Sequence, residues 1–273
     1  MISLIQTSQN RKYELTRFVK SLNGQKGINF GDIQLIFIDQ GDNKDVFSSL
    51  NPNIIFTYIK KPQCSLSHAR NIGLDYVKGE YLGFPDDDCW YEENTLSQIF
   101  SCFDNGFSGV IARSTDENGL TTNKSPQKSQ FISLYNHCGA ISYTIFLKYI
   151  PKLLFDEKLG VGSPYRFSSG EETDYLIRFI KQFNSNIYYN SNIIIHHPKG
   201  KCGNFHNIEL KQYEYARGWG YLLRKHHFPL NIIIKSFIRP IGGIIISILC
   251  LKRNSCLHSY YILKGRFEGF FSK

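Results

Sequence analysis

The chain has 273 residues, 42% of them apolar, so it can bury a substantial core and is not a disordered protein. Its formal charge of +9 at first suggests a nucleic-acid partner. However, residues 1–200 carry 20 basic and 20 acidic side chains, whereas residues 201–273 carry 12 basic and 3 acidic ones. The excess positive charge of residues 201–273 lies among isoleucines and leucines. We therefore expect this segment to bind an anionic membrane surface, and we expect no nucleic-acid partner.

The cysteines indicate a reducing compartment. The seven cysteines are an odd number and are scattered without a CxxC pair. No secretory signal precedes the first predicted strand, which begins almost directly after Met1. We therefore expect the protein in the cytoplasm, at the inner face of the cell membrane.

Apolar runs of strand length alternate with helical patterns through the first half of the chain, as is typical of a parallel sheet with covering helices. The predicted strands are 2–5, 33–38, 54–59, 81–84 and 109–112. The predicted helices are 13–22, 67–77 and a segment marked by Leu96, Ile99, Phe100 and Phe103. The sequence therefore predicts an α/β fold.

The second half has fewer clear signals. Residues 114–130 are rich in Ser, Thr, Asn, Lys and Gln and predict an exposed loop. A helix is expected to open within 168–174, a strand at 193–197 and a further helix at 217–226. Residues 231–251 are apolar, but their longest uncharged stretch is about 12 residues, short of the roughly 20 that span a bilayer.

We expect this apolar segment to lie in the membrane interface, with a buried core helix as the alternative. The predicted domains are accordingly 1–228, which carries the α/β fold, and 229–273, a basic and apolar helical extension.

Three consecutive aspartates, Asp86, Asp87 and Asp88, directly follow the predicted strand 81–84. In open parallel sheets, ligands bind at the carboxyl ends of the strands. Carboxylate oxygens at such a turn suit Mg²⁺ or Mn²⁺ shared with substrate phosphates. The alternative is a solvated acidic turn.

Two glutamates, Glu171 and Glu172, are candidates for a general base. Acidic residues in a first helical turn also favour the helix dipole, and Ser168 or Ser169 is a suitable N-cap, so a structural role is the alternative. Arg70 is placed to meet a phosphate or ribose, although a single helical arginine is usually a surface charge.

The order of these segments resembles the family 2 glycosyltransferases with the GT-A fold. The resemblance covers roughly residues 1–226 and depends on five motifs in the family's order. They are Ile2-Ser-Leu-Ile-Gln-Thr7 with Arg11, Leu35-Ile-Phe-Ile-Asp39, His68-Ala-Arg-Asn-Ile-Gly73, Gly79-Glu-Tyr-Leu-Gly-Phe-Pro-Asp-Asp-Asp88, and Gly170-Glu-Glu-Thr-Asp174 with Arg178.

This resemblance implies a GT-A, Rossmann-like nucleotide-binding fold with a mainly parallel central sheet and a C-terminal helical extension that associates with the membrane. It implies an inverting single displacement from a nucleotide-sugar donor, with UDP favoured and Mg²⁺ or Mn²⁺ as cofactor. The implied residues are Thr7, Asp39, Arg70, Asp86 and Asp87 for the nucleotide-sugar, Asp88 and Asp86 for the metal, and Glu172 or Glu171 as base. The family more often has aspartate where Glu172 stands, which leaves both glutamates as candidates.

The predicted strand 193–197 ends in two histidines. Some GT-A enzymes complete the metal site with a histidine from a late strand, so the resemblance implies His196 as a third ligand, with His197 as the alternative. Histidines at such positions also occur without any metal. A zinc site from these two histidines with Cys202 and His206 fits no standard spacing and is set aside.

The implied acceptor is a glycan or a lipid-linked oligosaccharide of surface polysaccharide synthesis. Two other functions remain open at this point. One is a catalytically inactive, membrane-attached binding module with the same fold, against which the intact acidic motifs argue. The other is a nucleotidyltransferase, which usually has a glycine-rich basic loop after the first strand, whereas Gln6-Thr-Ser-Gln-Asn-Arg11 has no glycine.

Overall fold

The computed structural model describes residues 1–183, 186–199 and 205–272. Contacts divide the chain into two compact units. The sheet unit comprises residues 1–64, 68–154 and 176–200, and the helical unit comprises 65–67, 155–175 and 201–273. The predicted boundary at residue 228 differs from this division, because residues 155–175 and the helix before residue 228 are grouped with the C-terminal helices.

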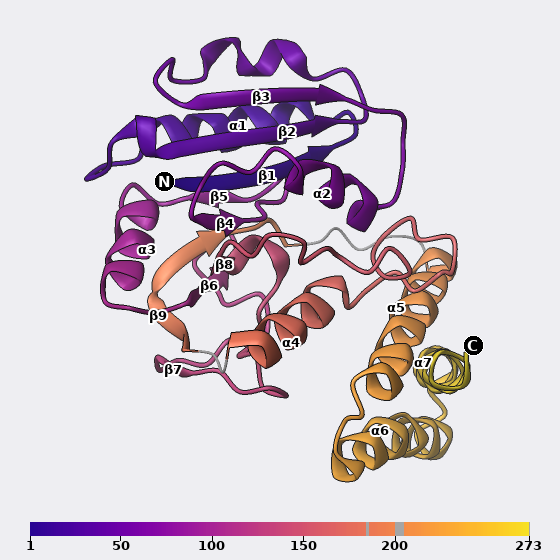
Figure 1. Ribbon diagram of the computed structural model, residues 1–273. Helices are drawn as coiled ribbons and strands as arrows, with labels where there is room; N and C mark the ends of the chain where they lie inside the picture. Colours follow the sequence, from indigo (N-terminus) through magenta and orange to yellow (C-terminus); the bar gives the residue numbers. More distant parts are fainter. Residues whose placement is uncertain (184–185, 200–204, 273) are drawn as a thin grey trace. The chain divides into compact units, whose positions relative to one another are not determined.

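The sheet unit is built on one mixed sheet (Figure 1), with the strand order β3-β2-β1-β4-β8-β6-β9-β5 and β7 paired with β9. The strands are β1 Ile2–Ser8, β2 Ile33–Asp39, β3 Ile55–Lys60, β4 Tyr81–Gly83, β5 Trp90–Tyr91, β6 Gly109–Thr115, β7 Gln130–Phe131, β8 Ile145–Lys148 and β9 Ile187–His196. In the described part of the chain, β1 to β4, β6 and β9 run in one direction and β5, β7 and β8 run against them. The predicted α/β fold with a mainly parallel sheet is confirmed.

Short helices accompany the strands. They are α1 Lys12–Asn23, α2 Leu66–Leu74, α3 Thr95–Asp104 and α4 Glu171–Phe183, with the 3₁₀ turns η1 Phe30–Asp32, η2 Lys44–Ser49 and η3 Ser142–Thr144. Helix α1 forms because its apolar residues recur at helical spacing and all four are buried: Leu15, Phe18, Val19 and Leu22. It ends at Asn23, and the amide of Gly24 bonds back to the carbonyls of its last turn.

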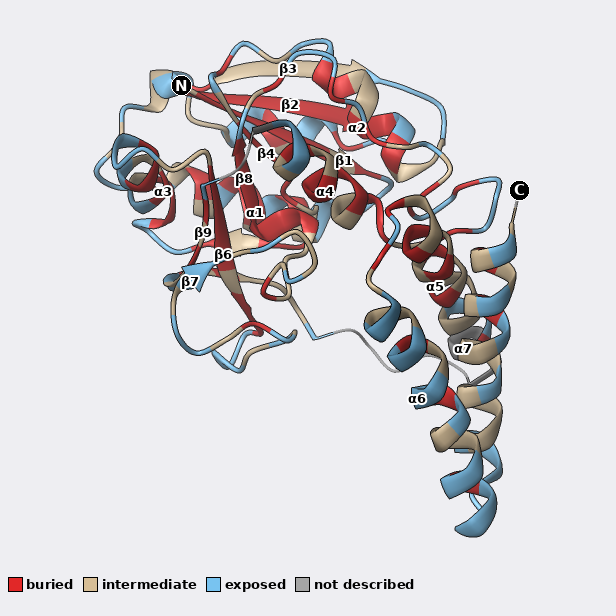
Figure 2. Cartoon of the chain, turned by 60° about the horizontal axis from the view of Figure 1, so that its bottom comes forward, coloured by how far each residue is buried: buried red, intermediate tan, exposed pale blue. Residues whose placement is uncertain are grey.

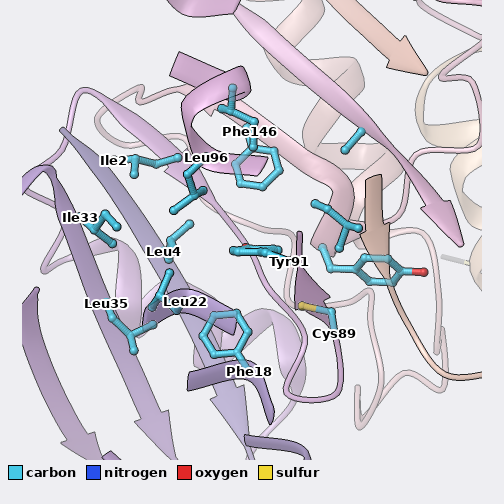
Figure 3. Close-up of a cluster of buried hydrophobic side chains, with 14 of the residues drawn as sticks. Ile2, Leu4, Phe18, Leu22, Ile33, Leu35, Cys89, Tyr91, Leu96 and Phe146 are labelled. Carbon is cyan, nitrogen blue, oxygen red and sulfur yellow. The ribbon is translucent and has the colours of Figure 1, made fainter. Parts of the chain in front are cut away.

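The core of the sheet unit lies where α1 and α3 pack against the sheet (Figure 3). Strand β2 is buried at every position, as expected of an interior strand of a parallel sheet covered on both faces. Cys89 and Tyr91, which directly follow the aspartates, also belong to this core. The acidic turn is therefore held in place by the buried residues that follow it.

The helical unit contains α5 Phe205–Lys225, α6 Leu230–Leu249 and α7 Arg253–Phe271. Helices α5 and α7 touch backbone to backbone. A side-chain carbon at Gly269 would overlap the carbonyl oxygen of Arg217, and one at Gly220 would overlap that of Arg266. Because only glycine permits this approach, α7 is an integral part of the unit and not a loose tail.

Helix α6 has its apolar side chains on the outside. The buried residues of α6 are Ser236, Pro240 and Ser247. Gly243 of the same helix lies against Ser259 of α7. Its exposed face is a stripe at helical spacing, made of Ile234, Ile238, Ile241, Ile245 and Leu249. Figure 2 shows that the surface of this helix is largely exposed. Helix α6 thus exposes large apolar side chains and buries small residues, whereas a helix on the surface of a water-soluble domain buries its apolar face.

The helix runs without a break through Pro240. Proline has no amide to donate to the carbonyl four residues earlier, which is that of Ser236. In this structure the guanidinium of Arg266 on α7 donates to that carbonyl instead. The longest uncharged stretch is about 12 residues, as the sequence indicates, but α6 as a whole is a continuous 20-residue helix that is long and apolar enough, by length and composition, to be a candidate membrane span.

Candidate functional site: an acidic turn, a histidine and two arginines

The three aspartates form a tight turn at the carboxyl end of β4. The amide of Cys89 donates to the carbonyl oxygen of Asp86 at 3.3 Å and closes the turn. Phe84 before the turn and Cys89 after it are fully or almost fully buried. The carboxylates are thus held on a fixed backbone at the edge of the sheet where β1 and β2 also end.

Asp86, Asp88 and His197 come together at this edge. One ligand atom from each of the three residues lies within 4.8 Å of the other two. His197 Nε2 is 2.9 Å from Asp88 Oδ1. Two carboxylates and an imidazole form a donor set that fits Mg²⁺ or Mn²⁺ completed by phosphate or water oxygens.

Of the two candidate histidines, His197 lies with Asp86 and Asp88, and His196 does not. Both ring nitrogens of His196 are already engaged, since Nδ1 is 2.9 Å from Thr115 Oγ1 and Nε2 is 3.2 Å from Glu92 Oε1. Its ring stacks on Trp90 with a centroid distance of 5.1 Å. Successive side chains of a strand point to opposite faces, so only one of the two neighbouring histidines can reach the aspartates. In the zinc alternative, Cys202 lies outside the described residues, as does the side chain of His206.

His197 is oriented by its surroundings. Its ring stacks on Tyr143 with a centroid distance of 4.7 Å and an interplanar angle of 12°. Its Nδ1 is 2.8 Å from the carbonyl oxygen of Pro198, which can only accept, so Nδ1 carries a proton and Nε2 faces Asp88. Burial lowers the pKa of His197, but the hydrogen bond and charge of Asp88 outweigh it, and the net effect raises that pKa.

Two arginines balance the acidic turn. Arg11 Nη1 lies 3.0 Å from both Asp87 Oδ1 and Asp88 Oδ2. Arg70, whose side chain is only 2% exposed, places Nη2 3.2 Å from Asp86 Oδ1. Arg70 therefore lies within the cluster and is not the surface charge of the alternative interpretation.

Two hydroxyls hold the turn from either side. Ser8 Oγ donates to Asp87 Oδ2 at 2.7 Å, and Ser142 Oγ donates to Asp86 Oδ1 at 3.2 Å. Asp87 thus faces the end of β1, whereas Asp86 and Asp88 share the side of His197. The geometry separates one aspartate from the two that would hold a cation.

The three carboxyl groups differ in acidity. Burial, with the negative charge of Asp88, raises the pKa of Asp86 despite Arg70. Burial raises the pKa of Asp87 to about 6 against the opposing effects of Ser8 and Arg11. Burial also acts to raise the pKa of Asp88, but His197 and Arg11 outweigh it and the net effect lowers that pKa. Burial, together with the unequal share of His197, Arg11 and Arg70 that each carboxylate receives, accounts for this spread, and a bound cation would lower the raised pKa values.

Thr7 and Asp39 lie at the carboxyl ends of β1 and β2. Thr7 pairs in register with Ile38, one position before the strands end. Asp39 is fully buried, and its oxygens accept from the amides of Gly41 and Asn43 and from the hydroxyl of Tyr58. Asp39 therefore shapes the turn after β2, and its direct contact with a nucleoside stays a prediction.

Glu171 and Glu172 open α4 and belong to the helical unit. The two serines proposed as N-caps do something else: Ser168 Oγ donates to Glu214 Oε2 at 2.7 Å, and Ser169 Oγ donates to the carbonyl of Tyr215 at 2.9 Å. Both acceptors lie on α5. The loop that precedes the two glutamates is therefore bound to α5, and these bonds help to fix where the glutamates lie.

Several residues of the cluster were not among the predicted site residues. Arg11 and Ser8 follow or end the first strand, so their position at the carboxyl edge was a usable signal. Ser142 and Tyr143 lie in an irregular segment about 55 residues after the aspartates, and no spacing connects them to the turn. Only the folded chain brings these two residues to the cluster.

Comparison with known proteins agrees with this geometry. The family model described as glycosyl transferase family 2 matches residues 3–168, more than half of the chain. The chain belongs to glycosyl transferase family 2. The expected enzyme class, a glycosyltransferase (EC 2.4), is thereby confirmed, and the nucleotidyltransferase alternative is excluded.

A sequence relative is the minor teichoic acid biosynthesis protein GgaB of Bacillus subtilis (strain 168), 34% identical over 108 residues. The match covers 37% of this chain and only 12% of that protein. The chain therefore corresponds to a small part of this relative's length.

Solved structures with a similar fold include S. aureus TarS, with a TM-score of 0.59 and 14% identity, covering 98% of this chain and 54% of that chain. TarS 1–349 in complex with UDP-GlcNAc gives a TM-score of 0.59 and 13% identity, covering 100% of this chain and 93% of that chain. The mannosyltransferase PcManGT from Pyrobaculum calidifontis, in complex with GDP-Man and Mn²⁺, gives a TM-score of 0.67 at 11% identity. The match covers 100% of this chain and 87% of that chain. These likenesses support a GT-A-like fold with C-terminal helices.

Proposed function

We propose that this chain is an inverting glycosyltransferase that moves a sugar from a UDP-sugar to a hydroxyl of a surface polysaccharide. The observation that carries the proposal is the cluster of Asp86, Asp88 and His197 at the carboxyl edge of a nucleotide-binding type of sheet. Solved structures of similar fold contain UDP-GlcNAc in one case and GDP-Man with Mn²⁺ in another, which supports a nucleotide-sugar donor and a divalent cation.

Asp86, Asp88 and His197 would hold the cation. When bound, Mg²⁺ or Mn²⁺ supplies positive charge that stabilises the departing nucleoside diphosphate. Asp88, whose pKa is lowered, is ready as an anion for this purpose. Arg11 and Arg70 offset the remaining charge of the acidic turn and fix the carboxylates in place.

The transfer itself needs one base. Glu172 or Glu171 takes the proton from the acceptor hydroxyl, and the acceptor oxygen forms a bond to the anomeric carbon. The bond from that carbon to the diphosphate breaks as the new bond forms, and the diphosphate leaves with the electron pair. A single displacement of this kind inverts the anomeric configuration.

Binding calorimetry tests the proposal most directly. UDP, GDP and dTDP are titrated into the wild-type chain and into Asp88→Ala, each with and without Mn²⁺. We expect one nucleotide, UDP, to bind in a Mn²⁺-dependent way, and we expect Asp88→Ala to abolish that dependence. If no nucleotide binds under any condition, the inactive binding module becomes the better explanation.

We infer that the acceptor is a cell-surface polymer of the teichoic-acid kind or its lipid-linked precursor. The support is the sequence relative, whose name places it in minor teichoic acid biosynthesis. Product analysis by mass spectrometry after incubation with UDP-sugars and purified teichoic acid tests this. A mass gain of one hexose or N-acetylhexosamine per transfer is expected, and transfer only to an unrelated glycan would contradict it.

We also infer that the helical unit rests on the cytoplasmic face of the membrane. Helix α6 exposes isoleucines to its outside, and the exposed basic residues Lys235, Arg239, Lys252 and Arg253 accompany them. An apolar stripe beside positive charge is complementary to an anionic bilayer. None of the cysteines among the described residues forms a disulfide, which is compatible with a reducing compartment.

Vesicle flotation tests this placement. The chain should float with vesicles containing phosphatidylglycerol and less with phosphatidylcholine alone. Replacing Ile238, Ile241 and Ile245 with serine should abolish flotation, whereas replacing the exposed Leu120 and Tyr13 of the sheet unit with serine should not. Release by alkaline carbonate would indicate interfacial binding, and retention would indicate that α6 spans the bilayer.

A further inference from the structure

Helix α5 serves as a platform for the turn that carries Glu171 and Glu172. The loop before the glutamates is bonded to α5 through Ser168 and Ser169. Gly170 adopts a φ of +95°, which favours glycine, and a side-chain carbon there would overlap Leu222 of α5. The backbone directly before the glutamates is therefore in close contact with α5.

A buried ionic network fastens the other side of this turn. Asp174, three residues after Glu171, is fully buried, and its Oδ1 lies 2.6 Å from Lys225 Nζ and 2.8 Å from His226 Nε2. Lys225 Nζ is also 2.6 Å from Asp156 Oδ2, to which the hydroxyl of Tyr221 donates at 3.1 Å. The ammonium thus joins two carboxylates of separate segments to the last turn of α5.

We propose that Asp174 and Lys225 are positioning residues for the catalytic base. The first turn of α4 is fastened to α5 on both sides of the glutamates, by the serines before them and by Asp174 after them. This inference rests on the proposed function, because it assigns the base to Glu172 or Glu171. It adds that the orientation of the base is set by a residue pair that touches no substrate.

The physical reason lies in the burial of the network. A carboxylate with no exposed surface is stable only when its charge is paired, so Asp174 holds Lys225 and His226 at fixed distances. Asp174 is one helical turn from Glu171 on the same helix, and the helix transmits its position rigidly. Loss of the pair removes the anchor that holds the C-terminal side of this first turn to the end of α5.

The test compares Asp174→Asn and Lys225→Met with wild type in steady-state transfer from the donor sugar and in calorimetric binding of UDP with Mn²⁺. Asparagine keeps the shape of Asp174 and removes its charge. We expect kcat to fall by on the order of 100-fold, as small misplacements of reacting groups do. The affinity for UDP with Mn²⁺ should not change, because the cation cluster belongs to the sheet unit.

Amide hydrogen exchange at residues 171–175 provides a readout that needs no activity. Both variants should exchange faster there than wild type, whereas the amides of β1 and β2 should not change. Ser236→Ala is the matched control, because it removes a partly buried hydrogen bond from Trp219 within the same helical unit and does not touch α4. It should lower the melting temperature but leave kcat and the exchange at 171–175 as in wild type.

Distinct results separate the two ideas. Unchanged exchange at 171–175 in both variants, or a loss of UDP affinity in parallel with kcat, would overturn the positioning role. If Asp174→Asn fails to fold, Lys225→Met decides the question. If the wild type transfers no sugar, the proposed function fails, and hydrogen exchange still tests whether the pair holds the turn. If Glu171→Gln and Glu172→Gln both keep full activity, neither glutamate is the base and the positioning role fails with that assignment.

Discussion

His197 and His196 are neighbours in the chain with different surroundings. His197 stacks on Tyr143, and its Nε2 faces Asp88. His196 stacks on Trp90, and its two ring nitrogens contact Thr115 and Glu92. The guanidinium of Arg17 covers the Trp90 ring, 3.8 Å from its centroid. One histidine is thus available to a cation, and the other is part of the packing around it.

This difference predicts unequal effects of the same substitution. His197→Gln should weaken Mn²⁺-dependent UDP binding by more than about tenfold, since even outer partners of metal ligands cost that much. His196→Gln should leave that binding intact and lower only the melting temperature. Calorimetry and thermal unfolding measure the two quantities, and equal losses of UDP affinity in both variants would contradict the assignment.

At the residue scale, the sequence predicted that aspartates and a histidine would meet at one edge of the sheet, but not which histidine. The position of Asp86 and Asp88 after a strand was enough to place them at the ligand-binding edge of the sheet. The choice between two adjacent histidines depends on which side of the strand faces the turn, and the end of β9 does not reveal that by itself. Ser142 and Tyr143 reach the cluster only through tertiary folding.

The contact of α5 with α7 illustrates what glycine does at the element scale. Gly265 and Gly269 on α7 and Gly220 on α5 let the two helix backbones approach each other directly. Close packing of this kind increases dispersion contacts, but it tolerates no added atoms. The position of α7 therefore depends on a few glycines and not on large apolar side chains.

Two alanine substitutions separate packing from helix propensity. Gly269→Ala should lower the free energy of unfolding by about 1–3 kcal/mol, because the new methyl group overlaps the carbonyl of Arg217. Gly242→Ala on α6 meets nothing within 4 Å and should raise it by about 0.5–1 kcal/mol through helix propensity. Urea unfolding measures both, and a neutral Gly269→Ala would mean that the helices can separate without cost.

Most elements of the sheet unit were predictable, because apolar periodicity and turn residues gave the strands and helices to within a few residues. The sequence also predicted a helical extension over 229–273, but not that α6 runs unbroken for 20 residues, since Lys235, Arg239 and Pro240 interrupt its apolar run. What keeps it continuous is the donation from Arg266 to the carbonyl of Ser236, a contact between residues 30 positions apart. No local pattern encodes that contact.

At the scale of the whole molecule, buried carboxylates make both units sensitive to acid. Burial acts to raise the pKa of Asp39, but hydrogen bonds from Asn43, Gly41 and Tyr58 outweigh it and lower that pKa. In the helical unit, burial likewise acts to raise the pKa of Asp156, and Lys225 outweighs it. Both groups therefore bind a proton less readily in the folded chain than in the unfolded chain.

A lowered folded pKa contributes stability above the ordinary carboxyl range, and that contribution is lost as the pH falls through the folded value. We expect the contributions of Asp39 and Asp156 to the free energy of unfolding to hold from neutral pH to about pH 5 and to decrease below about pH 4. Asp39→Asn should reduce stability at pH 7 and flatten the acid dependence. Urea unfolding across this pH range measures the slope, and an unchanged slope in the variant would show that Asp39 contributes nothing to it.

The glycine contact between α5 and α7 also decides where the chain can be cut. A chain ending at Phe228 would lack α7, and the backbone of α5 at Gly220 and Arg217 would then face water across a surface made to fit another helix. Because α5 also holds the turn before Glu171, such a shortened enzyme would lose activity even with a water-soluble acceptor. Dependence on the bilayer is better examined by replacing the outward isoleucines of α6, which leaves that contact complete.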